Sequence, residues 1–72
     1  MSSSSIIQED DGWYYLDETE DIGGGPYANE YLASAAQILY CLLNLGSYSR
    51  EDEKSLRAKY IELKLKGESL EI

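Results

Sequence analysis

The residues whose types and spacing could do chemistry are the glycines at 23–25, Pro26 after them, and the acids at 17–21 before them. A glycine run ahead of a helix can hold a phosphate with its backbone amides, usually with a lysine before a serine or threonine. The segment GGGPYANE contains no lysine, Pro26 lacks an amide N–H, and the nearby carboxylates would repel a polyphosphate. We therefore interpret the run as a turn and a short return strand, and predict no phosphate site.

The same acids are candidate calcium ligands, because Asp17 and Asp21 hold the first and fifth positions of an EF-hand-like loop. The sixth position requires glycine and holds Ile22, and the twelfth holds Ala28 where a bidentate glutamate belongs. With no histidine and one cysteine in the chain, a zinc site is also disfavoured. We predict no metal and no cofactor.

Catalysis has few candidate groups. The chain has no histidine to serve as a base, and Cys41 has no basic residue near it in the sequence. Cys41 is interpreted as a small apolar packing residue. A chain of 72 residues also has little room to enclose a ligand pocket. We predict that the protein is not an enzyme.

Charge divides the chain into two parts. Residues 1–48 contain eight acids and no base, whereas residues 49–72 contain six of each. An uncompensated acidic field repels nucleic acid and anionic lipid and attracts basic protein surfaces. The alternative interpretation is that the acidity serves only solubility. Four bases align on one helical face, which we interpret as solvated and salt-bridged rather than as a phosphate contact: Arg50, Lys54, Arg57 and Lys64.

The length predicts one domain of marginal stability, because small chains bury a small fraction of their surface. Cys41 is alone, so no internal disulfide can assist, and a partner of the same or another kind is expected to do so. No basic, apolar leader and no membrane-length apolar segment is recognised in the sequence, so we expect a cytoplasmic location and no membrane partner.

Residue patterns predict an α+β fold, a two-stranded β-hairpin followed by two antiparallel helices. The serine-rich tail, residues 1–10, is expected to be disordered, and residues 11–72 form the domain. The first strand begins at Gly12, because the aromatic residues after it favour strands, and the return strand ends near Tyr27.

The first helix is expected at 30–45, with Asn29 as its N-cap and Gly46 at its C-terminal end. Its circumference is almost entirely apolar, so one hairpin cannot cover it. Another subunit or the second helix must cover the rest, and the residues that would mediate self-association are Leu32, Ala36, Leu39 and Leu43.

The second helix is expected to begin after Ser49, which can cap it together with Asp52, and to stop at Gly67. The alternating pattern that begins at Ile61 would also suit an edge strand. Residues 60–72 are therefore open to either interpretation, although helix propensity favours the helix.

The order of residues from Trp13 to Ala28, W-Y-Y-x-D-E-T-x-D-I-x-x-G-P-Y-A, before an alanine-rich helix, resembles small hairpin–helix modules of phage and bacterial proteins of unassigned role. The likeness covers about half of the chain and encodes a hairpin entering a helix rather than a chemistry. In size and acidity the chain also looks like anti-defence proteins of phages, including anti-CRISPR proteins and DNA mimics.

Charge and resemblance together suggest an inhibitor, encoded by a phage or mobile element, that blocks a basic nucleic-acid-binding surface of a host protein. The residues expected at that contact are Asp10, Asp11, Tyr14, Asp17, Glu18, Glu20, Asp21 and Tyr27. The alternative is a dimeric structural or adaptor module that associates through the apolar helix at 30–45. A small enzyme subunit is a third class, for which the sequence supplies no pocket.

Overall fold

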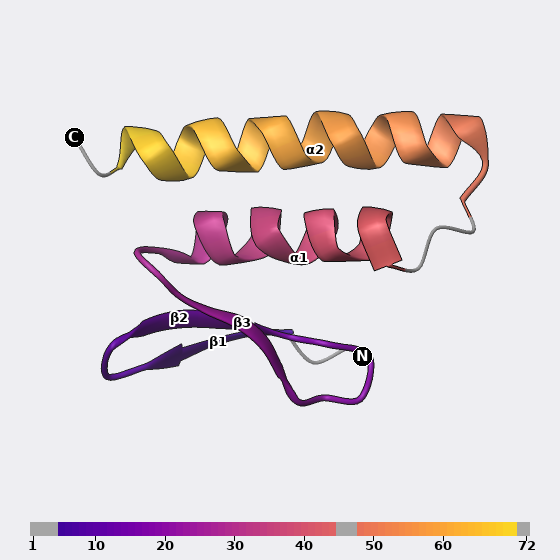
Figure 1. The fold of residues 1–72 in the computed structure, drawn as a ribbon. Helices are drawn as coiled ribbons and strands as arrows, with labels where there is room; N and C mark the ends of the chain where they lie inside the picture. Colours follow the sequence, from indigo (N-terminus) through magenta and orange to yellow (C-terminus); the bar gives the residue numbers. More distant parts are fainter. Residues whose placement is uncertain (1–4, 45–47, 71–72) are drawn as a thin grey trace.

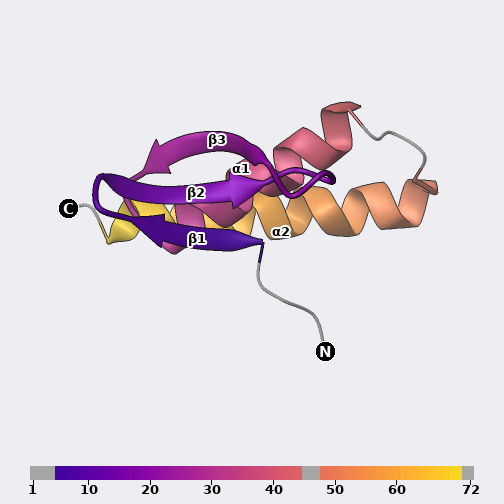
Figure 2. The same ribbon diagram turned by 90° about the horizontal axis from the view of Figure 1, so that it is seen from below.

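The computed structural model describes residues 5–44 and 48–70, which form a sheet layer and two helical layers (Figure 1). The sheet is antiparallel with the strand order β1-β2-β3, as Figure 2 shows. Helix α1 packs on one face of the sheet, and α2 packs on α1 without reaching the strands. The elements are β1 (Ile6–Glu9), β2 (Gly12–Leu16), β3 (Ile22–Tyr27), α1 (Glu30–Asn44) and α2 (Arg50–Ser69).

The first strand corrects the sequence prediction. Residues 6–9 were expected in a disordered tail, but they pair with β2 and turn the hairpin into a three-stranded sheet. Ile6 lies opposite Tyr15, and the Leu16 amide donates to the Ser5 carbonyl at 2.8 Å. Two isoleucines next to an aromatic strand therefore suffice to recruit this segment. The predicted α+β class is confirmed, and residues 1–4 of the expected tail lie outside the described residues.

The glycines of β3 allow Tyr15 to pack against the backbone of that strand. Tyr15 is 7% exposed and its ring lies over Gly23 and Gly24, where a Cβ at Gly24 would stand 2.7 Å from the ring. The same ring stacks with Tyr27 at 6.4 Å and meets Tyr40 of α1 at 5.9 Å between centroids. The glycine run lies inside strand β3, which confirms the predicted return strand and corrects the interpretation of these glycines as a turn. Its lack of side chains makes room for the central aromatic residue.

Helix α1 begins at the predicted cap. The Asn29 side-chain carbonyl accepts from the Leu32 amide at 3.0 Å, which satisfies one of the unpaired amides of the first turn. Ala33 and Ala35 are buried, so the middle layer is thin and both neighbouring layers approach it closely. The last predicted residue of this helix and its proposed glycine cap, at 45 and 46, lie outside the described residues.

Helix α2 begins as expected and ends later than expected. Ser49 Oγ accepts from the Asp52 amide at 3.2 Å, which confirms the cap. The prediction of a stop at Gly67 is wrong, because the helix continues to Ser69. Gly67 is buried against α1: its carbonyl accepts from Asn29 Nδ2 at 3.0 Å, and a Cβ there would stand 2.7 Å from Leu32. Gly67 thus permits close helix packing.

Residues 60–69 are helical, which resolves the choice between helix and edge strand for this segment; residues 71–72 lie outside the described residues. Over the described stretches, neither helix combines the length and apolar character that crossing a membrane requires.

Candidate protein-interaction surfaces

The acids predicted to form one contact surface lie in two separate turns. Asp10 and Asp11 belong to the β1–β2 turn, and residues 17–21 form the β2–β3 turn. Because β2 runs between them, the turns lie at opposite ends of the sheet (Figure 2). At about 3.3 Å per residue, the six steps from Asp11 to Asp17 span roughly 20 Å. The structure does not bring all six carboxylates together.

The β2–β3 turn is held by its own first residue. Asp17 Oδ1 accepts from the Thr19 hydroxyl at 2.6 Å, from the Thr19 amide at 2.8 Å and from the Asp21 amide at 3.1 Å. These hydrogen bonds, that from the Thr19 hydroxyl above all, lower the pKa of the Asp17 carboxyl below its usual 3.8. Asp17 is therefore a structural carboxylate that remains charged while it orders the turn.

Glu18 ties the turn to α1. Its Oε1 accepts from the Tyr40 hydroxyl at 2.6 Å, and this hydrogen bond raises the pKa of Tyr40 to about 12. Glu20 has a left-handed backbone with φ 66° and, like Asp21, is exposed. Asp21 Oδ2 accepts from the Thr19 hydroxyl at 3.2 Å. The turn thus presents Glu20 and Asp21 outward on a hydrogen-bonded frame.

The two predicted tyrosine anchors lie on opposite faces of the sheet. Tyr14 pairs with Ile7, and both project from the face opposite to that of Tyr15 and α1. The Tyr14 hydroxyl donates to Asp11 Oδ2 at 2.8 Å, and that bond raises the pKa of Tyr14. Tyr27 instead stacks with Tyr15 and lines a groove beside α1. Tyr14 is therefore hydrogen-bonded to one of the predicted acids, whereas Tyr27 packs on the face of the sheet that α1 covers.

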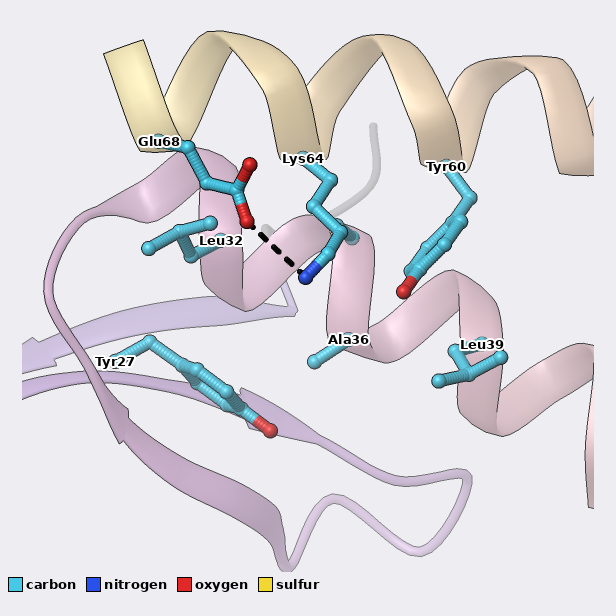
Figure 3. Close-up of a pocket in the computed structure, with 8 residues that line it drawn as sticks. Tyr27, Leu32, Ala36, Leu39, Tyr60, Lys64 and Glu68 are labelled. Atoms are coloured by element: carbon cyan, nitrogen blue, oxygen red, sulfur yellow. Dashed lines mark ion pairs between the residues drawn. The ribbon is translucent and has the colours of Figure 1, made fainter. Parts of the chain in front are cut away.

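A groove runs between the two helices on the β3 side of the molecule. One hollow of about 320 Å³ lies between Tyr27, Ala36 and Tyr60, with the Lys64–Glu68 ion pair at its rim (Figure 3). A second of about 320 Å³ lies between Leu43, Arg57 and Ile61. Leu39 and Tyr60 line both. The four residues predicted for self-association line these two hollows: Leu32, Ala36, Leu39 and Leu43.

Large apolar side chains remain exposed beside this groove. Leu43, which is 74% exposed, Ile61, which is 55% exposed, and the exposed Leu39 line the second hollow. Leu65 of α2 is exposed as well but lines neither hollow. We call these four residues the helix-pair face. Ile61 and Leu65 lie four residues apart, one turn along α2, and both are exposed. Helix α1 instead packs on the face of α2 that contains Gly67.

The bases accompany the helix-pair face rather than the acidic turns. Glu53 pairs with Arg57 at 2.8 Å and Lys64 with Glu68 at 3.2 Å, all exposed on α2. Lys66 lies 5.1 Å from the centre of the Tyr31 ring. The ion pairs of Arg57 and Lys64 agree with the predicted salt-bridged face, to which Lys66 was not assigned. Within residues 5–44 and 48–70 the structure has two ion pairs, and each joins two residues of α2.

Cys41 is half-buried in α1 beside Tyr48. Partial burial and the neighbouring thiol raise the pKa of Tyr48. Within the part of the chain that the structure describes, no three acids, histidines or cysteines converge on a site for a metal ion.

Comparison with protein-family models, with curated proteins and with solved structures gave no match. The fold and its surfaces are thus the basis for assigning a function.

Proposed function

We propose that this protein is a non-catalytic inhibitor that binds a basic, nucleic-acid-binding surface of a host protein with its acidic turns. The source that fits this role is a phage or mobile element acting in the cytoplasm of a bacterial host, as an anti-CRISPR or other anti-defence protein. Competition is steric and electrostatic, with carboxylates in the places that phosphates would occupy.

The observation that carries the proposal is the construction of the β2–β3 turn. Asp17 and Thr19 fix the turn, and Glu18 fixes it to α1, so Glu20 and Asp21 are held outward before any partner arrives. Preorganised charges bind at a lower entropic cost than charges on a mobile tail. Among the described residues no base pairs with these acids, and their field is left for a partner.

Between the two acidic turns, the outer face of the sheet adds apolar side chains to the proposed interface. Ile7 and Tyr14 project from it, and Ile22 at the start of β3 is 57% exposed. An apolar centre with a charged rim is the usual composition of a protein interface. The roughly 20 Å between the turns matches about six base pairs at 3.4 Å each.

A pull-down from bacterial lysate at low and moderate salt tests this function. Three proteins are compared: wild type, Glu20→Gln/Asp21→Asn, and the control Glu51→Gln/Asp52→Asn, which removes the same charges from the exposed start of α2. We expect wild type and control to retain the same basic protein at low salt. Neutralising the turn should weaken binding roughly two- to thirtyfold.

The retained protein is then mixed with a labelled DNA or RNA duplex, which wild type should displace. Retention that does not change with salt, or that is as strong in the turn variant as in wild type, contradicts charge mimicry. Binding without displacement contradicts inhibition at a nucleic-acid site.

A further inference from the structure

The groove between α1 and α2 continues past its two apolar hollows into a basic one. A third hollow of about 270 Å³ lies among Arg50, Lys54 and Arg57 at the start of α2. It shares Glu53 and Arg57 with the second hollow, so the two are contiguous. The second hollow in turn joins the first, shown in Figure 3, at Tyr60. One open groove therefore runs along most of α2, apolar in its middle and basic at the start of the helix.

The charges of α2 are sorted between the groove side and the far side of the helix. At about 100° per residue, four bases fall on the groove side: Arg50, Lys54, Arg57 and Lys64. Two acids fall there as well, Glu53 and Glu68. The other three acids of the helix lie away from the groove: Glu51, Asp52 and Glu62. With four bases against two acids, the groove side of α2 is positively charged, although the whole chain is acidic.

The basic end of the groove is not neutralised by the chain itself. Within residues 5–44 and 48–70, the two ion pairs use Arg57 and Lys64 and leave Arg50 and Lys54 without a carboxylate partner. Arg50 is moreover the first residue of α2, at the positive end of the helix dipole, where a further positive charge is unfavourable. The stability of the helix therefore does not account for a base at this position, and the positive field there is left for an anionic group.

We propose that this groove binds an acidic amphipathic helix of a partner protein. Large apolar side chains of that helix enter the two apolar hollows, and its carboxylates face Arg50 and Lys54 in the third. A helix that lays its apolar side into a groove is a recurring form of peptide recognition. The charge of the groove side selects an acidic helix over a basic one, because complementary charge favours the correct partner and repels the wrong one.

The apolar middle of the groove favours a peptide over a nucleic acid. Leu39, Leu43 and Ile61 line it, and a phosphate backbone has no apolar side chains to cover them. A long polyanion would also meet the repulsive field of the acidic turns. A short segment avoids that field, because α1 lies between the turns and α2 (Figure 1) and charges more than about 10 Å apart are screened at ordinary ionic strength.

The spacing of the hollows sets the pattern of the partner helix. Along α2 the first hollow centres on Lys64, the second on Arg57 and the third on Lys54. At 1.5 Å per residue, these steps are about 10 Å and about 5 Å. Two apolar residues two turns apart therefore reach the first two hollows, and acids one turn beyond the second reach the third.

Fluorescence anisotropy of a labelled peptide mixed with the full chain tests the proposal. The probe is a helix of about 18 residues built on alanine and glutamine, with two leucines two turns apart and glutamates one turn beyond the second. We expect wild type to bind it at physiological salt with a Kd below about 100 μM. Two control peptides carry lysine in place of the glutamates or serine in place of the leucines, and each should bind at least about tenfold more weakly.

Matched variants of the protein locate the peptide in the groove. Lys54→Glu should weaken binding about fivefold, whereas Lys59→Glu, at an exposed base on the far side of α2, should change it by less than about twofold. Ile61→Ser should weaken binding about tenfold. Leu70→Ser controls for it, because Leu70 is 60% exposed against 55% for Ile61 and lines none of the three hollows. Circular dichroism establishes that each variant is folded.

Absence of binding at about 1 mM protein, or equal binding of the acidic and the lysine peptide, overturns the proposal. Binding that Lys54→Glu and Ile61→Ser leave unchanged overturns the site. A DNA duplex that displaces the acidic peptide, or a wild-type dimer that Ile61→Ser dissociates in sedimentation, overturns the occupant. The inference does not rest on the proposed inhibitory function: Glu20→Gln/Asp21→Asn should bind the peptide as wild type does, and its loss of lysate binding would bear only on that function.

Discussion

The sheet and α2 lie on opposite sides of α1 and meet solvent in different ways. The sheet carries its charge in turns, where Asp17 and Glu18 are held by hydrogen bonds to Thr19 and Tyr40. In α2 the acids and bases pair along the helix, as Glu53 does with Arg57, and apolar side chains remain exposed between them. The sheet thus exposes uncompensated acids in its turns, whereas α2 exposes paired charges with apolar side chains between them.

This difference follows from what α1 can contribute. Its two buried residues are alanines, so it provides close contact to both layers and little apolar volume. On the sheet side this apolar volume comes from Tyr15, whose ring fills the space over the β3 glycines. Helix α2 has no comparable central residue and approaches α1 through Gly67. Helix α1 is therefore closely covered on its sheet side, and its α2 side is covered less completely.

The largest expected effect on stability is at Tyr15. Tyr15→Ala removes the ring that joins the sheet to Tyr40 of α1 and should cost about 3–5 kcal/mol in the free energy of unfolding. Chemical denaturation measures this loss. Tyr14→Ala, on the solvent face of the same strand, is the control and should cost clearly less; equal losses would contradict the assignment of Tyr15 as the central residue of the core.

The helical layers should respond to Gly67→Ala. The added methyl would meet Leu32 at 2.7 Å and Asn29 Oδ1 at 2.9 Å, so α2 must move away from α1. Overpacking of this kind costs about 1–3 kcal/mol, against a gain of about 1 kcal/mol in helix propensity. Ser55→Ala, at an exposed position of α2, controls for propensity. A stability gain equal to that of the control would show that the helices do not pack closely at Gly67.

The β2–β3 turn should make the stability of the fold depend on pH in the acidic range. Because the pKa of Asp17 is lowered in the folded chain, its contribution is present above the unfolded value of 3.8 and is lost as the pH falls through the folded value. Melting temperatures from neutral pH down to pH 2 should show this loss in wild type and a smaller one in Asp17→Asn. Identical acid profiles would mean that the Thr19 hydrogen bonds do not hold the turn.

The smallest expected effect is at the link between the turn and α1. The pKa of Tyr40 is raised to about 12, so the stability that its hydrogen bond to Glu18 provides is complete below pH 10 and lost as the pH rises toward 12. Ultraviolet titration of wild type against Tyr40→Phe isolates this phenol. A transition near 10 that disappears in Tyr40→Phe would contradict the hydrogen bond.

Local signals predicted most of the elements and few of the contacts between them. Asn29 and Ser49 could be assigned as caps because a cap depends on residues within one turn. Gly67 was mistaken for a helix stop because its role depends on Leu32, distant in sequence. Strand β1 was missed for a similar reason, since Ile6 becomes a strand residue only by pairing with Tyr15.

The candidate surfaces were predicted in composition more than in arrangement. The excess of acids could be read directly, but their division between two turns depends on the length of β2 and the direction of the chain. Tyr14 and Tyr27 have the same residue type and were grouped together, although strand pairing sends them to opposite faces. The four residues predicted for self-association line the groove, as expected for an almost entirely apolar helix that needs cover on more than one side, and self-association itself stays a prediction.

One titration tests whether a basic partner binds the sheet and not α2. Backbone amide NMR of the wild-type protein is followed as a short lysine-rich peptide is added at low salt, with sedimentation of the same samples. We predict shifts at residues 9–11 and 17–22 that disappear as salt is raised, no shifts at Leu43, Ile61 or Leu65, and no change in the oligomeric state of the protein. Shifts centred on α2, or a change of oligomeric state when the peptide is added, would contradict the account.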